Sequence, residues 1–446
     1  MTNLDKITAQ KIIQALGTGA TPAVGLEHVS VGRAFWLEAI NKFYLNDFIR
    51  QGGSAVKFLE GDWGSGKTHF LNLMRREAFG RDYVVSLVTL KSREAPFNKF
   101  EIIYQRIING LSTKTKPDGD ALKHILDKWY RDVYEQFASK FEDRILDEPR
   151  IKAELEYKIF ELAMLDGIDS DFRNALKAYF QNMLEAKSSR DEENTIILDW
   201  IRGKEIPKPE LRKFQIFSRI DKLNSKEMMK SLVRALVFFG YTGLIILLDE
   251  AESIPSILRS KDTEQAYDNI RELMDNTDGR GKGGTNNCMF LYATTPTFFE
   301  SRIGIRTYGA LYQRVKDELK DQFQLTGVRN PRATIIDLEQ DPLESDDMLE
   351  IAKRIRTIHS VAFDWKANAK VSDDTLKEYV NFIDSQNLTT DISKPRILVK
   401  SVTQLLDICM QDESFDPKKH IDHLLRNSII ALNKQREQEE QEIPGN

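Results

Sequence analysis

The sequence predicts an α/β protein with a parallel β-sheet core, a helical insertion and a C-terminal helical lid. Three separate segments predict the sheet: residues 61–68 read GDWGSGKT, residues 243–250 read GLIILLDE, and residues 288–296 read CMFLYATTP. An apolar run typical of a buried strand precedes or forms each segment. The two helical parts are predicted from the charged and aromatic residues between 116 and 209 and from the pattern after residue 342.

Residues 61–68 fit the phosphate-loop pattern G-x-x-x-x-G-K-[ST] at every fixed position. A strand-like run at 55–59 precedes them and a run with helical apolar spacing at 69–76 follows, in the order that phosphate binding requires. The glycines allow successive N–H groups to point at phosphate oxygens, and the positive end of the helix dipole adds to the attraction. Lys67 is predicted to reach the β- and γ-phosphates of ATP, and the Thr68 hydroxyl to hold Mg²⁺. The predicted nucleotide contacts of this loop are Gly61, Gly64, Ser65, Gly66, Lys67, Thr68 and His69.

The apolar run at residues 243–250 ends in two carboxylates, which is typical of the second half of a triphosphatase site. Asp249 is predicted to hold the Mg²⁺ shell. Glu250 is predicted to polarise the water that attacks the γ-phosphate. The two adjacent acids therefore predict hydrolysis of ATP and not binding alone. We interpret the neighbouring Glu252 as a charge at a helix start rather than as a third catalytic acid.

The strand predicted at residues 288–296 stops in two hydroxyls and a proline. In triphosphatases with an added catalytic glutamate, a polar residue at this strand end orients the attacking water. Thr295 is the preferred residue for this role and Thr294 the second choice. The alternative is that these threonines cap the next helix, for which Thr297 is also suited.

Arginines later in the chain are candidates for completing the site. Arg306, and Arg314 after it, follow the third strand where an oligomeric ATPase places a finger for its neighbour's γ-phosphate, although ordinary surface arginines are the alternative. Arg396 lies in the first turn of a predicted helix, where an arginine of the lid would reach back to the nucleotide. Val31 and Arg33 precede an amphipathic helix and are placed to cover adenine. This order of motifs favours an AAA+-like P-loop ATPase over a small-molecule kinase.

These segments also carry a family resemblance. The chain resembles the ATP-binding proteins of BREX phage-defence systems, the BrxD-like group in particular, at residues 9–19, 31–33, 61–71, 200–203, 240–250 and 308–311. The resemblance extends from the start to about Arg396, and its more specific parts are the N-terminal helix and the tract 240–250. It implies a role in bacterial defence, with Lys67 and Thr68 in the phosphate loop, Asp249 at the metal and Glu250 in catalysis.

Composition indicates an ordinary globular chain. With 446 residues, 41% hydrophobic and 30% charged, it is long enough for two or three domains with large buried cores. No apolar run approaches the roughly 20 residues of a membrane helix, and the N-terminus lacks a secretory core, so neither a membrane span nor a signal peptide is predicted. The two cysteines, Cys288 and Cys409, are predicted to be reduced and buried, which favours a cytoplasmic location.

The formal net charge of −5 and a pI near 5.9 predict no bulk attraction to nucleic acid, so any DNA contact must be local. The best candidate is the loop at residues 278–287, which carries Arg280 and Lys282 between glycines. In ring-shaped AAA+ assemblies a loop at this place often faces the central channel. The alternative is that this loop only connects two elements through solvent and contacts no DNA.

The predicted divisions are an N-terminal helix and linker at 1–28, the first ATPase part at 29–115, a helical insertion at 116–215, the second ATPase part at 216–341, and the lid and tail at 342–446. The aromatic residues of the insertion either form its core, which the pattern favours, or present a partner surface.

We expect an ATPase that forms homo-oligomers or binds other defence-system proteins, with ATP hydrolysis driving assembly or remodelling of a protein–DNA complex. One alternative is a nucleotide-dependent scaffold or switch with incidental turnover. Another is a DNA loader similar to origin-recognition proteins, although little chain after Arg396 is left for a winged-helix domain.

Overall fold

The computed structural model describes most of the chain, namely residues 4–22, 24–91, 93–140, 148–185, 189–256, 260–277, 284–316, 329–385 and 393–441. Its centre is one six-stranded sheet in the order β3-β2-β4-β5-β1-β6. The strands are β1 Ser54–Glu60, β2 Val84–Thr89, β3 Leu111–Ser112, β4 Leu244–Asp249, β5 Cys288–Thr294 and β6 Ile335–Asp337. Only the β2–β3 pairing is antiparallel among the described strands. The predicted α/β class with a mostly parallel sheet is confirmed.

The sheet is buried on both faces, and its two central strands, β4 and β5, are apolar up to the polar residue at which each ends. Along β4, Ile246 and Leu248 join the core on one face, and Ile245 and Leu247 join the core on the other. The helices beside the sheet are α2 Ala34–Ile40, α3 Lys67–Phe79, α4 Phe100–Asn109, α10 Ser225–Phe238, α11 Ser260–Thr277, α12 Thr297–Glu300 and α13 Gly309–Val315. Short π or 3₁₀ segments complete this part: η1 Leu26–His28, η2 Asn41–Phe48, η3 Ala251–Ser253, η4 Ile305–Thr307 and η5 Leu338–Gln340.

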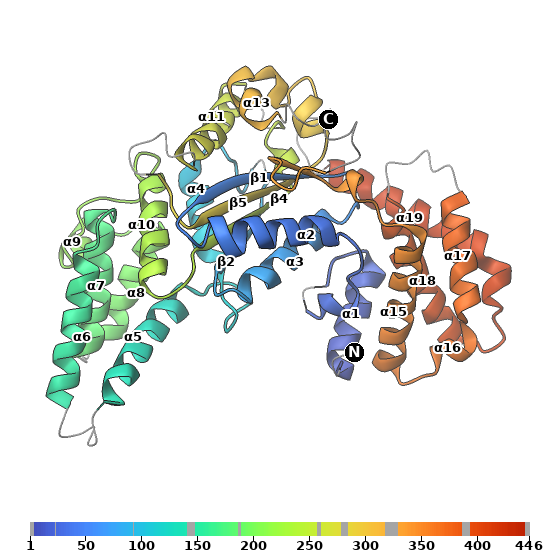
Figure 1. Ribbon diagram of the computed structural model, residues 1–446, viewed down its shortest axis with the longest axis horizontal. Helices are drawn as coiled ribbons and strands as arrows, with labels where there is room; N and C mark the ends of the chain where they lie inside the picture. The colour runs from blue at the N-terminus through green and yellow to red at the C-terminus, as the bar shows by residue number, and fades with distance from the viewer. Residues whose placement is uncertain are drawn as a thin grey trace.

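The predicted helical insertion is a group of helices on one side of the sheet (Figure 1). It contains α5 Leu122–Ala138, α6 Glu148–Ala163, α7 Ser170–Glu185, α8 Arg190–Ile201 and α9 Lys208–Arg212. Trp129, Phe172 and Phe180 are buried in the same apolar cluster as one face of the sheet, so these aromatic residues are core, as the pattern favoured. Tyr157 and Phe160 on α6 differ, because they are more than half exposed.

A helical bundle lies on the opposite side of the sheet (Figure 1). We call it the C-terminal bundle, and it contains α15 Ser345–Phe363, α16 Ala367–Lys370, α17 Asp373–Ser385, η6 Pro417–His420, α18 Lys394–Gln411 and α19 Ile421–Gln441. The N-terminal helix, α1 Lys6–Thr18, packs into it: Ile12 and Leu16 share an apolar cluster with Ile355 of α15. The Gln10 side-chain amide also donates to the Ala362 carbonyl over 3.1 Å. The two ends of the chain therefore build one unit.

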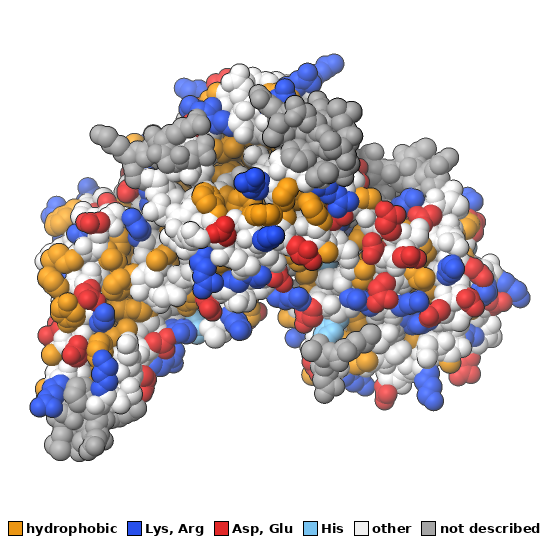
Figure 2. Space-filling model, viewed as in Figure 1, with side chains coloured by type: hydrophobic (Ala, Val, Ile, Leu, Met, Phe, Trp, Pro, Cys, Tyr) orange, Lys and Arg blue, Asp and Glu red, His pale blue; other side chains and the backbone are white. Residues whose placement is uncertain are grey.

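The two helical groups diverge from the core and leave an open gap below it, and the visible face of the bundle mixes acidic and basic side chains (Figure 2). No helix among the described residues has the length and apolar character needed to cross a membrane. Cys288 and Cys409 are free and buried, as expected from the sequence.

Candidate functional site

A cavity of about 2170 Å³ lies where the phosphate loop, the end of β4 and the C-terminal bundle meet. Drug-sized ligands usually occupy pockets of about 300–1,000 Å³, so a nucleotide would fill part of it. Residues 62–69 line the cavity from the core, and Pro395, Arg396 and Val399 line it from α18. Parts of the chain that are more than 300 residues apart thus share one site.

The phosphate loop has the backbone that its sequence predicts. Gly64 and Gly66 have φ values of +82° and +97°, which non-glycine residues rarely adopt, and α3 begins directly after Gly66. The Lys67 ammonium donates to the carbonyls of Gly61 over 2.8 Å and of Asp62 over 3.0 Å. Burial lowers the pKa of Lys67, while the charges of Glu252 and then Asp249 raise it. The loop therefore holds a buried cation beside a helix N-terminus, which suits a phosphate.

The two predicted metal ligands lie together. The Thr68 hydroxyl donates to Asp249 Oδ2 over 2.7 Å, and the Glu250 N–H donates to Asp249 Oδ1 over 3.0 Å. A hydroxyl and a carboxylate are the hard oxygen donors that Mg²⁺ prefers, and Mg²⁺ commonly takes its other ligands from phosphates and water. Within the described residues no cluster of three or more His, Cys, Asp or Glu side chains could hold a metal ion.

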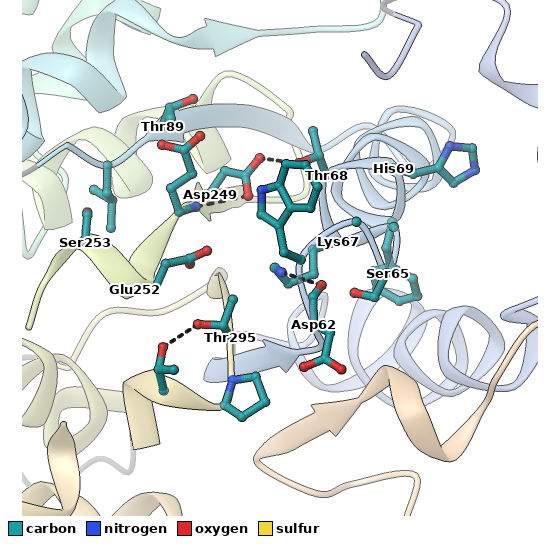
Figure 3. Close-up of a pocket in the computed structure, with 18 of the residues that line it drawn as sticks. Asp62, Ser65, Lys67, Thr68, His69, Thr89, Asp249, Glu252, Ser253 and Thr295 are labelled. Atoms are coloured by element: carbon teal, nitrogen blue, oxygen red, sulfur yellow. Dashed lines mark hydrogen bonds between the residues drawn. The ribbon is translucent and has the colours of Figure 1, made fainter. Parts of the chain in front are cut away.

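The acids after β4 differ from the sequence interpretation. Glu250 has a φ of +56°, is exposed, and lines the cavity. Glu252, interpreted as a helix-start charge, does lie in the short helix η3, but its side chain is directed toward Lys67 and lies near Thr295 (Figure 3). Burial raises the pKa of Glu252, and the charge of Lys67 opposes that rise. Its Oε2 atom is buried without a hydrogen-bond partner among the described residues.

The structure distinguishes the two candidate sensor threonines. Thr295 lines the cavity, with its hydroxyl 2.7 Å from that of Thr297 (Figure 3). Thr294 is fully buried, does not line the cavity, and its hydroxyl has no hydrogen-bond partner in the described part of the chain. The helix-cap alternative is wrong, because α12 begins after Pro296 and has no side-chain cap.

The C-terminal bundle contacts the phosphate loop directly. The Arg396 guanidinium lies over the ring of Trp63, 3.7 Å from its centroid, and the Ser393 hydroxyl donates to the Gly64 carbonyl. A Cβ atom at Gly64 would lie 3.0 Å from the Arg396 side chain. Arg396 lines the cavity and stacks on an aromatic residue of the loop, and its predicted contact with the nucleotide stays a prediction.

The region predicted to cover adenine is built around Arg33. Its guanidinium donates to the carbonyls of Leu338 and Asp341 and, over 3.2 Å, to that of Ser65. Arg33 and Val31 line the cavity, but the contacts of Arg33 hold loops together. His69 is near Ser30, 2.9 Å from its hydroxyl, and burial together with the charge of Arg33 lowers the pKa of His69 to about 4. Sequence reasoning missed the apolar lining of this region: Leu16, Val29, Leu343, Ile351 and Val399.

The arginine candidates differ in their surroundings. Arg314 forms a bidentate pair with Asp275, at 2.6 and 3.1 Å, so its guanidinium is engaged within its own chain. Arg306 is exposed and does not line the cavity. Arg302, which the sequence did not single out, is exposed and lines it. Arg280 and Lys282 of the candidate DNA loop lie outside the described residues.

Comparison with known families gives one clear match. The family described as BREX system ATP-binding protein BrxC/D matches residues 4–424, which is nearly the whole chain. The chain therefore belongs to this family of ATP-binding proteins of phage-defence systems. No curated protein matches it significantly.

Proposed function

We propose that this member of the BREX ATP-binding protein family binds Mg-ATP in the cavity and hydrolyses it as an AAA+-like P-loop ATPase. The observation that carries the proposal is the convergence of Lys67, Thr68 and Asp249, since it joins the phosphate loop to a distant acidic strand end. The sheet order supports it, because β5 separates β1 from β4 and brings Thr295 between the loop and the acids.

The chain's own residues account for binding and charge placement. The phosphate-loop N–H groups and Lys67 would hold the β- and γ-phosphates, and Thr68 and Asp249 would hold Mg²⁺. The ion, when bound, would neutralise charge that develops on the phosphates. Thr295 would orient the attacking water, and an acid after Asp249 would accept its proton. The sequence-based candidate for that acid is Glu250.

Nucleotide binding at this place would couple ATP to movement of the C-terminal bundle, which would then act as a lid. The direct contacts of Ser393 and Arg396 with the phosphate loop support this coupling. In a defence system the movement would serve assembly or remodelling of a protein–DNA complex, with homo-oligomers or other defence proteins as partners. The same contacts favour the second candidate, a nucleotide-dependent switch in which turnover is incidental.

The test is to measure the ATPase rate and the molecular mass with and without DNA, in wild type and in Lys67→Ala. Magnesium-dependent turnover in wild type that Lys67→Ala abolishes supports the ATPase. Stimulation by DNA favours remodelling over the switch. Tight ATP binding with no turnover above the Lys67→Ala background would refute hydrolysis and leave the switch.

A further inference from the structure

The chain has two glutamates after the metal-binding aspartate, at the first and third following positions, in the run Asp249-Glu250-Ala251-Glu252. The backbone places their two side chains differently. Glu250 takes a left-handed backbone conformation with φ of +56°, which turns the chain as it leaves β4. The short helix η3 then begins, and Glu252 lies within it at the cavity wall.

The surroundings of the two side chains differ. Glu250 also lines the cavity, but its side chain is exposed to solvent. Glu252 is half-buried, and one of its oxygens is shielded from solvent without a hydrogen-bond partner among the described residues. A buried unpaired carboxylate oxygen is costly, and it persists where a ligand or water completes it.

The position of Lys67 points to the same residue. Lys67 and Glu252 line the same cavity. A lysine that binds the β- and γ-phosphates lies next to the reacting phosphorus, so an acid directed toward that lysine lies close to the attacking water. Figure 3 shows Glu252 directed toward Lys67 and near Thr295, the predicted water-orienting residue.

On the basis of the proposed ATPase activity, we propose that Glu252, rather than Glu250, is the catalytic acid that contacts the attacking water. The water oxygen bonds to the γ-phosphorus while its proton passes to the Glu252 carboxylate. The bond from the γ-phosphorus to the bridging oxygen breaks, and its electron pair leaves on ADP. The proton then passes to the released phosphate, which restores the carboxylate. Glu250 instead places its N–H on Asp249 and so positions the metal-binding carboxylate.

The test compares three glutamine variants, each of which keeps the shape of the side chain and removes its charge. Glu252→Gln is expected to lower kcat by roughly 10²- to 10⁴-fold, the usual contribution of a positioned base, with ATP affinity within about threefold of wild type. Glu250→Gln is expected to lower kcat by less than about tenfold, because its backbone contact survives. Glu227→Gln, in the first turn of α10 and outside the cavity, is the matched control and keeps wild-type turnover.

Three results would overturn the assignment. Wild-type turnover in Glu252→Gln, with Glu250→Gln inactive, returns the role to Glu250. Weaker ATP binding by Glu252→Gln at unchanged kcat shows that Glu252 only positions Lys67. Full activity of Glu252→Asp, whose shorter side chain moves the carboxylate by about one bond length, also argues against direct contact with the water. Melting curves and ATP titrations establish that each variant is folded. Absence of turnover in wild type would instead refute the ATPase itself, so the two failures are distinguishable.

Discussion

Replacing Arg396 with alanine removes the stacking contact between the C-terminal bundle and the phosphate loop. The guanidinium lies 3.7 Å from the centroid of the Trp63 ring, and both residues are partly buried. A partly desolvated cation–π contact contributes about 1–2 kcal/mol. If ATP binds the docked form, weaker docking lowers the binding-competent fraction and raises the apparent Kd by at most about 5- to 30-fold.

Isothermal titration with a slowly hydrolysed ATP analogue measures this change. Lys394→Ala is the matched control, because Lys394 lies in the same first turn of α18 but pairs with Asp384 over 3.0 Å and does not line the cavity. Trp63→Leu removes the same contact from the other side. The double variant Arg396→Ala with Trp63→Leu is therefore expected to bind ATP no more weakly than either single variant.

Two results would refute this reasoning. Wild-type affinity in Arg396→Ala would show that docking of the bundle does not limit nucleotide binding. Additive losses in the double variant would show that Arg396 acts on the nucleotide and not through Trp63.

Three further predictions concern the rest of the site. Lys67→Ala should abolish tight ATP binding at an unchanged melting temperature; ATP binding as tight as wild type in a titration would contradict the phosphate-loop assignment. Mixing Arg306→Ala with Lys67→Ala subunits should restore part of the ATPase activity, because an arginine finger supplied in trans contributes roughly 10³- to 10⁵-fold in rate. No recovery at any mixing ratio, together with a monomeric mass, would exclude shared sites. Finally, the pKa of His69 is about 4 in the folded chain and its ordinary value is near 6.5. The unfolded chain therefore binds more protons between these values, and stability should fall as the pH drops from about 6.5 toward 4. His69→Gln should flatten this part of the melting-temperature curve, whereas replacing the exposed His423 should not.

The backbone of residues 61–68 could be predicted from the sequence because its geometry is local. Gly64 and Gly66 allow the positive φ values that the loop needs, and Lys67 follows at the start of α3. The strands could be predicted for a similar reason, since a continuous apolar run such as β4 is stable only when both of its faces are covered. The same two segments also carried the resemblance to the family of BREX ATP-binding proteins.

Other features depended on how distant segments pack. Nothing in residues 4–16 indicates that Ile12 lies against α15, because an amphipathic helix specifies an apolar face but not its partner. The placement of Arg396 over Trp63 likewise needed the whole bundle to dock on the loop.

The sequence by itself determined which residue types stand at the phosphate loop and at the acidic strand end. Only the tertiary structure decided which acid faces the loop, because a single left-handed residue, Glu250, turns the chain and directs Glu252 into the cavity. It also decided that Thr295 rather than Thr294 lines the site and that Arg314 is held by Asp275. The direction of a side chain at the end of a strand depends on the backbone torsion angles there and on neighbouring residues from elsewhere in the chain. The spacing of residues along the sequence specifies neither of these.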